Sequence, residues 1–83
     1  MDLKLNSAYL LITCNDGRLD EVMTQIKHLD NIKEVQGTYG AYDIIAKIES
    51  TTLEHLQTFI VQKIRTLSDV KNAMMLHCKT TLH

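Results

Sequence analysis

Apolar and polar residues alternate along this chain with two different periods, and each period predicts a type of element. Residues 8–14 are apolar and rich in strand formers, and turn residues follow at 15–17, which predicts a first strand. Between residues 18 and 29, apolar side chains recur at the three- and four-residue spacing of one helix face. The positions on that face are Leu19, Val22, Met23, Ile26 and Leu29.

Two further strands are predicted at residues 32–39 and 42–49, joined at Gly40 and Ala41. Glycine at the first central position of a two-residue loop favours a type II′ hairpin turn. A second helix follows, because Thr51 and Glu54 have the spacing of a capping box and an apolar stripe continues to Leu67. A last strand is predicted at residues 70–81.

The order is therefore β-α-β-β-α-β within 83 residues. That order predicts an α+β protein with the ferredoxin-like fold, a four-stranded antiparallel sheet with both helices on one face. The chain has the length of one small domain, so we expect a single domain over residues 1–83.

The face of the sheet without helices is expected to be polar if it meets water. Strand alternation instead places Tyr9, Leu11, Ile45 and Met75 there, and assigns Met74 and Leu76 to the helix side with Leu10 and Ile12. A contiguous apolar patch of that kind seldom stays exposed. We therefore expect a second copy to cover it, as a two-fold homodimer of the dimeric α+β barrel type.

Composition narrows the classes of function. Lys and Arg number 9 against 10 for Asp and Glu, so the net charge of −1 lacks the basic excess of a nucleic-acid-binding domain. No apolar run is long enough to cross a membrane, and the first residues do not resemble a signal peptide. We expect a cytoplasmic protein with no direct contact to nucleic acid or membrane.

Candidate chemistry for catalysis or metal binding is weak. The two cysteines, Cys14 and Cys78, stand far apart and without a close metal-ligand pair, so they are expected to be free thiols. No spacing supports a Ser or Cys nucleophile with its base, and no glycine-rich phosphate loop is present. We expect no catalytic residue, no metal and no cofactor.

The most informative cluster is the predicted hairpin tip, residues 38–43. It gathers Tyr39, Tyr42 and Asp43 around Gly40 and Ala41. Such a tip offers phenol hydroxyls, backbone N–H groups and one carboxylate to a small zwitterion. The alternative interpretation is a plain turn with two packing tyrosines.

The run VQGTYGAYDIIAK, from Val35 to Lys47, resembles the hairpin of the effector-binding (RAM) domain of the Lrp/AsnC transcription regulators. Gly40, Tyr42 and Asp43 match its Gly-x-Tyr-Asp pattern. The resemblance covers nearly the whole chain. It runs from Ala8–Ile12 through Gly17, Val22, Val35 and Val70.

The resemblance implies dimers that pair sheet to sheet, often assembled into tetramers or octamers, with amino acids bound near the hairpin. In such a site the backbone at Gly40 and Ala41 would receive the ligand carboxylate, Asp43 its ammonium, and Tyr39 or Tyr42 would border the pocket. Full-length members carry a DNA-binding helix-turn-helix domain. Only seven residues precede the first predicted strand, so the resemblance implies a stand-alone domain that acts through full-length relatives.

One departure from the family is clear. The family often has a Thr-x-Thr pattern early in the last strand, with hydroxyls in the effector cleft, and the aligned residues here are Ala73 and Met75. The sequence thus favours a non-enzymatic, small-molecule-binding and oligomerisation module. The alternatives are an assembly module without a ligand, a small dimeric α+β barrel enzyme, and an ACT-like domain that would bind its ligand at Gly17.

Overall fold

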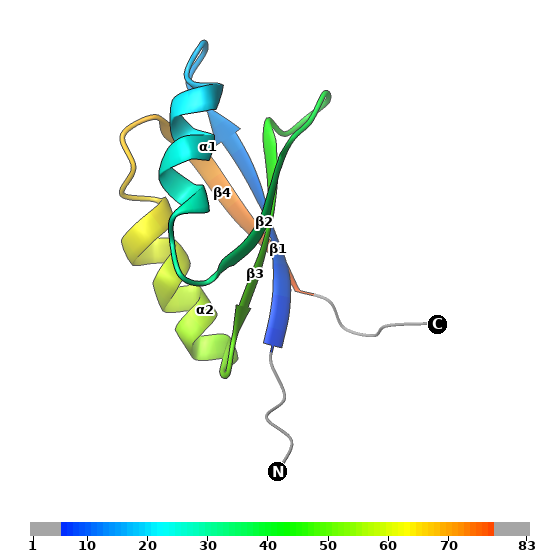
Figure 1. The fold of residues 1–83 in the computed structure, drawn as a ribbon, viewed down its shortest axis with the longest axis vertical. Coiled ribbons are helices and arrows are strands. Elements are labelled where there is room, and N and C mark those ends of the chain that lie inside the picture. The colour runs from blue at the N-terminus through cyan, green and yellow to red at the C-terminus, as the bar shows by residue number, and fades with distance from the viewer. Residues whose placement is uncertain (1–5, 78–83) are drawn as a thin grey trace.

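A computed structural model describes residues 6–77 of the chain (Figure 1). The elements are β1 (Asn6–Cys14), α1 (Leu19–Lys27), β2 (Ile32–Gly37), β3 (Ile44–Ser50), α2 (Leu53–Phe59), a π-helical segment η1 (Ile60–Ile64) and β4 (Val70–His77). Both helices lie on one side of the sheet and leave the other side bare. The predicted ferredoxin-like fold is confirmed. The predicted extension of the last strand to Thr81 lies outside the described residues.

The strands lie in the order β2-β3-β1-β4, and every pairing is antiparallel. Strands β1 and β3 are central, and β2 and β4 form the edges. One face of each strand and one stripe of each helix point into the layer between sheet and helices. The large side chains fully buried there are Leu10, Ile12, Val22, Ile26, Ile44, Ile48, Leu56 and Ile64.

Helix α2 begins one residue later than the predicted capping box places it. Thr52 is the N-cap, and its hydroxyl accepts a hydrogen bond from the backbone N–H of His55 at 3.0 Å. The helix continues into η1, where the N–H of Arg65 donates to the carbonyl of Ile60 at 2.9 Å. The Arg65 guanidinium then donates to the Ala73 carbonyl at 3.0 Å, which ties this helix to the edge strand β4.

The hairpin between β2 and β3 differs from the predicted turn. The regular strands end at Gly37 and begin again at Ile44, and these two residues are paired, as a loop centred on Gly40 and Ala41 requires. The φ angle of Gly40 is 139°, far from the value near +60° of a type II′ turn. Residues 38–43 therefore form an irregular arm instead of two extended strands and a tight turn.

The predicted face assignment of the last strand is wrong. Met75 lies directly opposite Leu10, and Ala73 lies opposite Ile12. Residues directly opposite each other share a face of the sheet. Ala73 is accordingly buried and Met75 packs against the core beneath the helices, so Met75 does not belong to the proposed dimer surface.

A β-bulge at Lys71 explains this error. Cys14 pairs with Val70, but Thr13 pairs with Asn72, so Lys71 is an extra residue with no opposite partner. Alternation counted from Val70 assigns every later residue to the wrong face, because a shift of one residue exchanges the two faces.

The bare side of the sheet is called the open face below. Its apolar residues are Tyr9, Leu11, Ile45, Met74 and Leu76. Ile45, Met74 and Leu76 are 36%, 45% and 55% exposed. Leu11 lies between Ile45 and Met74 across the strands, and Tyr9 lies beside Leu76, so the five side chains form one patch.

Candidate functional site

The hairpin arm, residues 38–43, projects from the sheet toward the side away from the helices (Figure 1). Tyr39 is fully exposed near its tip, and Tyr42 is half-buried nearer its base. Gly40 has a positive φ, and a Cβ at this position would meet no atom within 4 Å. A larger residue would be strained by its backbone conformation alone, so glycine is needed here for the shape of the tip.

The base of the arm is held by Asp43. Its Oδ2 atom accepts a hydrogen bond from the backbone N–H of Cys14 at 2.8 Å, and its own N–H donates to the carbonyl of Ile12 at 2.9 Å. The Thr38 hydroxyl also donates to the carbonyl of Tyr42 within the arm. Asp43 therefore stabilises the end of β1, a role that the sequence did not indicate. Its Oδ2 atom is already bonded to the N–H of Cys14, which leaves Oδ1 for any ligand.

The loops beside this base are joined by an ion pair that the sequence also did not indicate. Arg18 Nε lies 3.0 Å from Asp69 Oδ2, and the backbone N–H of Asn15 donates to the Asp69 carbonyl at 2.8 Å. The hydrogen bond and charge of Asp69 raise the pKa of Arg18. Burial, followed by the charges of Asp43 and Asp69, raises the pKa of the Cys14 thiol. Cys14 is a free, buried thiol.

The structure separates Ala73 and Met75 from the other predicted effector residues. Ala73 is opposite Ile12, and Ile12 in turn is opposite Ile44, so a full strand lies between Ala73 and the base of the arm. Ala73 and Met75 also point toward the helices. Within one copy of the chain, only the residues of the arm lie together: Tyr39, Gly40, Ala41, Tyr42 and Asp43.

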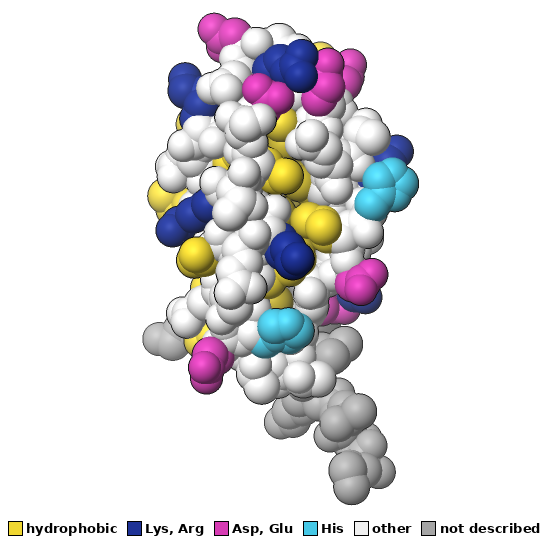
Figure 2. Space-filling model, turned by 90° about the vertical axis from the view of Figure 1, so that its left-hand side faces the viewer, with side chains coloured by type: hydrophobic (Ala, Val, Ile, Leu, Met, Phe, Trp, Pro, Cys, Tyr) yellow, Lys and Arg dark blue, Asp and Glu magenta, His cyan; other side chains and the backbone are white. Residues whose placement is uncertain are grey.

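Polar side chains border the apolar patch of the open face. Lys47 lies opposite both Tyr9 and Glu34, and Gln36 lies opposite Ile45, on the side of β2. Near the start of β1 and the end of β3, the Ser7 hydroxyl donates a hydrogen bond to the Glu49 carboxylate at 3.2 Å. On the helix side, by contrast, charged and histidine side chains interrupt the apolar atoms (Figure 2). An apolar centre with a polar rim is typical of a protein interface.

A serine–histidine contact joins the end of β3 to α2. Ser50 Oγ lies 2.6 Å from His55 Nδ1, and Ser50 is buried. In the part of the chain that the structure describes, no carboxylate hydrogen-bonds to His55, so the pair lacks the orienting acid of a catalytic triad. Residues 6–77 also hold no cluster of three potential metal ligands, and none of their helices is long and apolar enough to cross a membrane.

A family model described as the Lrp/AsnC ligand binding domain matches residues 7–77. The chain thus belongs to the Lrp/AsnC ligand-binding-domain family. Among solved structures, the crystal structure of FFRP-DM1 is similar, with 32% identity over 88% of this chain and 97% of that chain and a TM-score of 0.84. A comparison with curated proteins found no match.

Two longer regulators share the fold. AsnC of Escherichia coli is 19% identical over 95% of this chain and 53% of its own, with a TM-score of 0.86. The transcriptional regulator NMB0573 of Neisseria meningitidis, solved as a complex with L-Met, is 12% identical over 98% of this chain and 53% of its own, with a TM-score of 0.85. This chain therefore spans about half the length of each of these two proteins.

Proposed function

We propose that this chain is a non-catalytic regulatory module that self-associates through its open face and binds an amino acid or a related small metabolite at the hairpin arm. The observation that carries the proposal is the arm itself, with its Gly40–Asp43 pattern, in a chain that belongs to the Lrp/AsnC ligand-binding-domain family. The complex of NMB0573 with L-Met supports the class of ligand.

Self-association is supported by the apolar patch on β1, β3 and β4. The side chains of Ile45, Met74 and Leu76 keep a third or more of their surface in water in a single copy. Covering them with a second copy removes that apolar surface from water, which favours association by roughly 25 cal/mol per Å² before the costs of binding. A two-fold pair brings the same patch of each copy together.

The ligand site is supported by the chemistry of the arm. The exposed backbone at Gly40 and Ala41 offers N–H groups to a carboxylate, and Tyr42 lies next to Asp43. Asp43 Oδ2 is already bonded to Cys14 N–H, so in this proposal Oδ1 is the oxygen that meets a ligand ammonium. Because the arm projects from the sheet, we propose that the pocket is completed by a neighbouring copy.

Regulation in this proposal passes through DNA-binding relatives. The chain has a net charge of −1, whereas direct DNA binding relies on a cluster of phosphate-neutralising Lys and Arg. Co-assembly with a relative that reads DNA would let the bound metabolite alter transcription. The alternative is an assembly module without a ligand. The engagement of Asp43 by β1 and the separation of Ala73 and Met75 from the arm favour this alternative.

Calorimetric titration with each of the twenty amino acids tests the ligand. We expect heat from at least one of them, and we expect Gly40→Val to abolish it because valine is strained at this φ. Gly17→Val is the matched control: Gly17 also has a positive φ, 76°, and an open surrounding, but it lies in the loop between β1 and α1.

The two glycine variants also separate the competing sites. Loss of binding only in Gly17→Val would indicate an ACT-like site instead of the hairpin site. The absence of heat with every amino acid at millimolar concentration would leave the assembly module as the function.

A further inference from the structure

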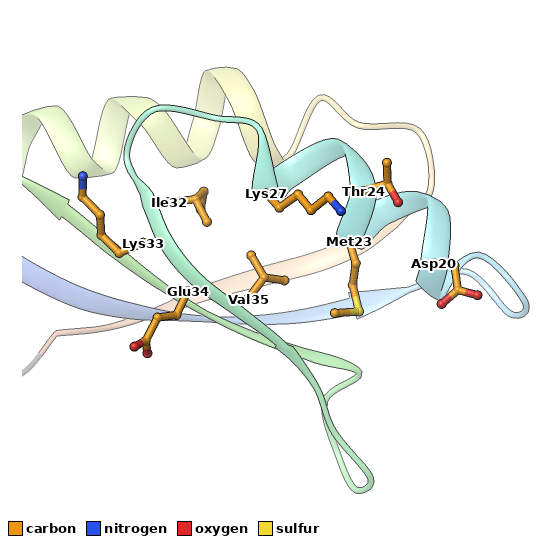
Figure 3. Close-up of a pocket in the computed structure, with 8 residues that line it drawn as sticks. All are labelled: Asp20, Met23, Thr24, Lys27, Ile32, Lys33, Glu34 and Val35. Atoms are coloured by element: carbon orange, nitrogen blue, oxygen red, sulfur yellow. The ribbon is translucent and has the colours of Figure 1, made fainter.

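A hollow on the helix side lies outside the proposed hairpin site, in a groove between α1 and the edge strand β2 (Figure 3). Its volume is about 370 Å³, within the range of small-molecule sites. It exists because α1 lies over β2 while no further strand follows β2 at that edge of the sheet. The groove opens on the side of the helices and does not include the hairpin arm or the open face.

The floor of the groove is apolar. Met23 on α1 and Ile32 and Val35 on β2 line it, and all three pack against the core while remaining partly accessible. Ile32 and Val35 share the inner face of β2 despite an odd spacing of three, because a second bulge falls between Ile32 and Glu34. The Glu34 side chain points away from the groove, so it leaves the floor apolar (Figure 3).

The wall of the groove on α1 is polar and carries both signs of charge. Thr24 and Lys27 lie three residues apart, so they are neighbours on one helix face. Asp20 lies seven residues before Lys27, about 10 Å along the helix axis. Within residues 6–77, the ion pairs all involve Arg18, so Lys27 and Asp20 have no charged partner there.

We propose that this groove binds a small monocarboxylate with a branched apolar body. The carboxylate meets the Lys27 ammonium and the Thr24 hydroxyl, and the apolar body covers Met23, Ile32 and Val35. Asp20 repels a second carboxylate, so dicarboxylates are rejected. An apolar amino acid and its deaminated acid both carry a carboxylate and an apolar body. They differ in the ammonium group, which the charge of Asp20 would attract. This site is separate from the hairpin site and does not depend on the proposed function.

The test uses the full chain and the probe 4-methylpentanoate in a titration followed by amide NMR shifts. We expect the largest shifts at residues 23–27 and 32–35. Lys27→Glu is expected to weaken binding about tenfold, because it replaces an attraction for the carboxylate with a repulsion. The matched control is Lys71→Glu, the same charge change at an exposed position of the opposite edge strand. Lys27 is itself exposed, so its variant is expected to fold.

Three results would overturn the proposal: no shift at millimolar probe, shifts confined to the hairpin arm, or equal weakening by Lys27→Glu and Lys71→Glu. A second titration, with L-leucine, distinguishes the two sources of the carboxylate. Tighter binding of L-leucine that Asp20→Asn removes identifies an amino acid, whose ammonium is attracted by the charge of Asp20. Tighter binding of 4-methylpentanoate identifies the deaminated acid.

Discussion

The carboxylate of Asp43 is assigned two roles, one in ligand binding and one in the structure of the arm. The family pattern at the hairpin suggests a ligand role, whereas the structure uses Oδ2 to bind the N–H of Cys14. Hydrogen bonds to a charged acceptor contribute about 1.5–3 kcal/mol, so this bond is a substantial part of what fixes the arm to β1. A ligand held by the remaining oxygen would act on a carboxylate that is already positioned.

The raised pKa of the Cys14 thiol, which lies next to Asp43, gives the stability of the chain a pH dependence that can be measured. Burial and the charges of Asp43 and Asp69 raise its pKa in the folded chain. As pH rises above about 8.5, the unfolded chain loses the thiol proton first. The native state then binds more protons than the unfolded state, so the free energy of unfolding falls with rising pH.

We therefore expect the urea midpoint of a Cys78→Ser protein to fall between pH 8 and pH 10. A Cys14→Ala, Cys78→Ser protein is expected to fall less steeply, and the difference between the two slopes isolates the thiol from lysines and tyrosines that titrate in the same range. Asp43→Asn should reduce the difference, because the amide can still accept the bond from Cys14 but carries no charge. Equal slopes with and without Cys14 would contradict this account.

At the scale of elements, the two edge strands each contain a bulge, and β4 shows its consequence most clearly. The bulge at Lys71 turns Met75 toward the helices and Met74 toward the open face. We expect Met75→Ser to lower the free energy of unfolding of the chain by about 1–3 kcal/mol, since it removes apolar contacts with the core. Met74 is 45% exposed in a single copy. Met74→Ser is therefore expected to leave the free energy of unfolding of the single copy nearly unchanged.

Urea unfolding at low protein concentration, where copies are separate, is the appropriate measurement. The two adjacent methionines are matched in chemistry and differ only in the face they occupy. A larger loss from Met74→Ser than from Met75→Ser would contradict the register of β4.

The sequence predicted the elements well because local periods determine them. The helix face of α1 and the alternation of β3 are readable from residues a few positions apart. The face of β4 was not readable, since it depends on pairing across β1 and on one unpaired residue, Lys71. The bonds of Asp43 to Cys14 and of Arg18 to Asp69 join residues 29 and 51 positions apart, for which local spacing has no signal.

On the scale of the whole molecule, the open face and the helix side each present an exposed apolar residue that can be exchanged for lysine. Leu76 on β4 is 55% exposed, and Val61 on η1 is 54% exposed. If copies pair through the open face, Leu76→Lys places a charge inside the interface, where it loses its water. Val61→Lys adds the same charge on the opposite side, where it stays hydrated.

We expect light scattering at micromolar concentration to give twice the chain mass for the wild type and for Val61→Lys, and the chain mass for Leu76→Lys. The thermal midpoint of the wild type should rise with protein concentration, because association stabilises the folded state by mass action. That dependence should disappear in Leu76→Lys. A wild-type chain of single mass, or equal dissociation in both lysine variants, would show that the open face is not the surface through which copies pair.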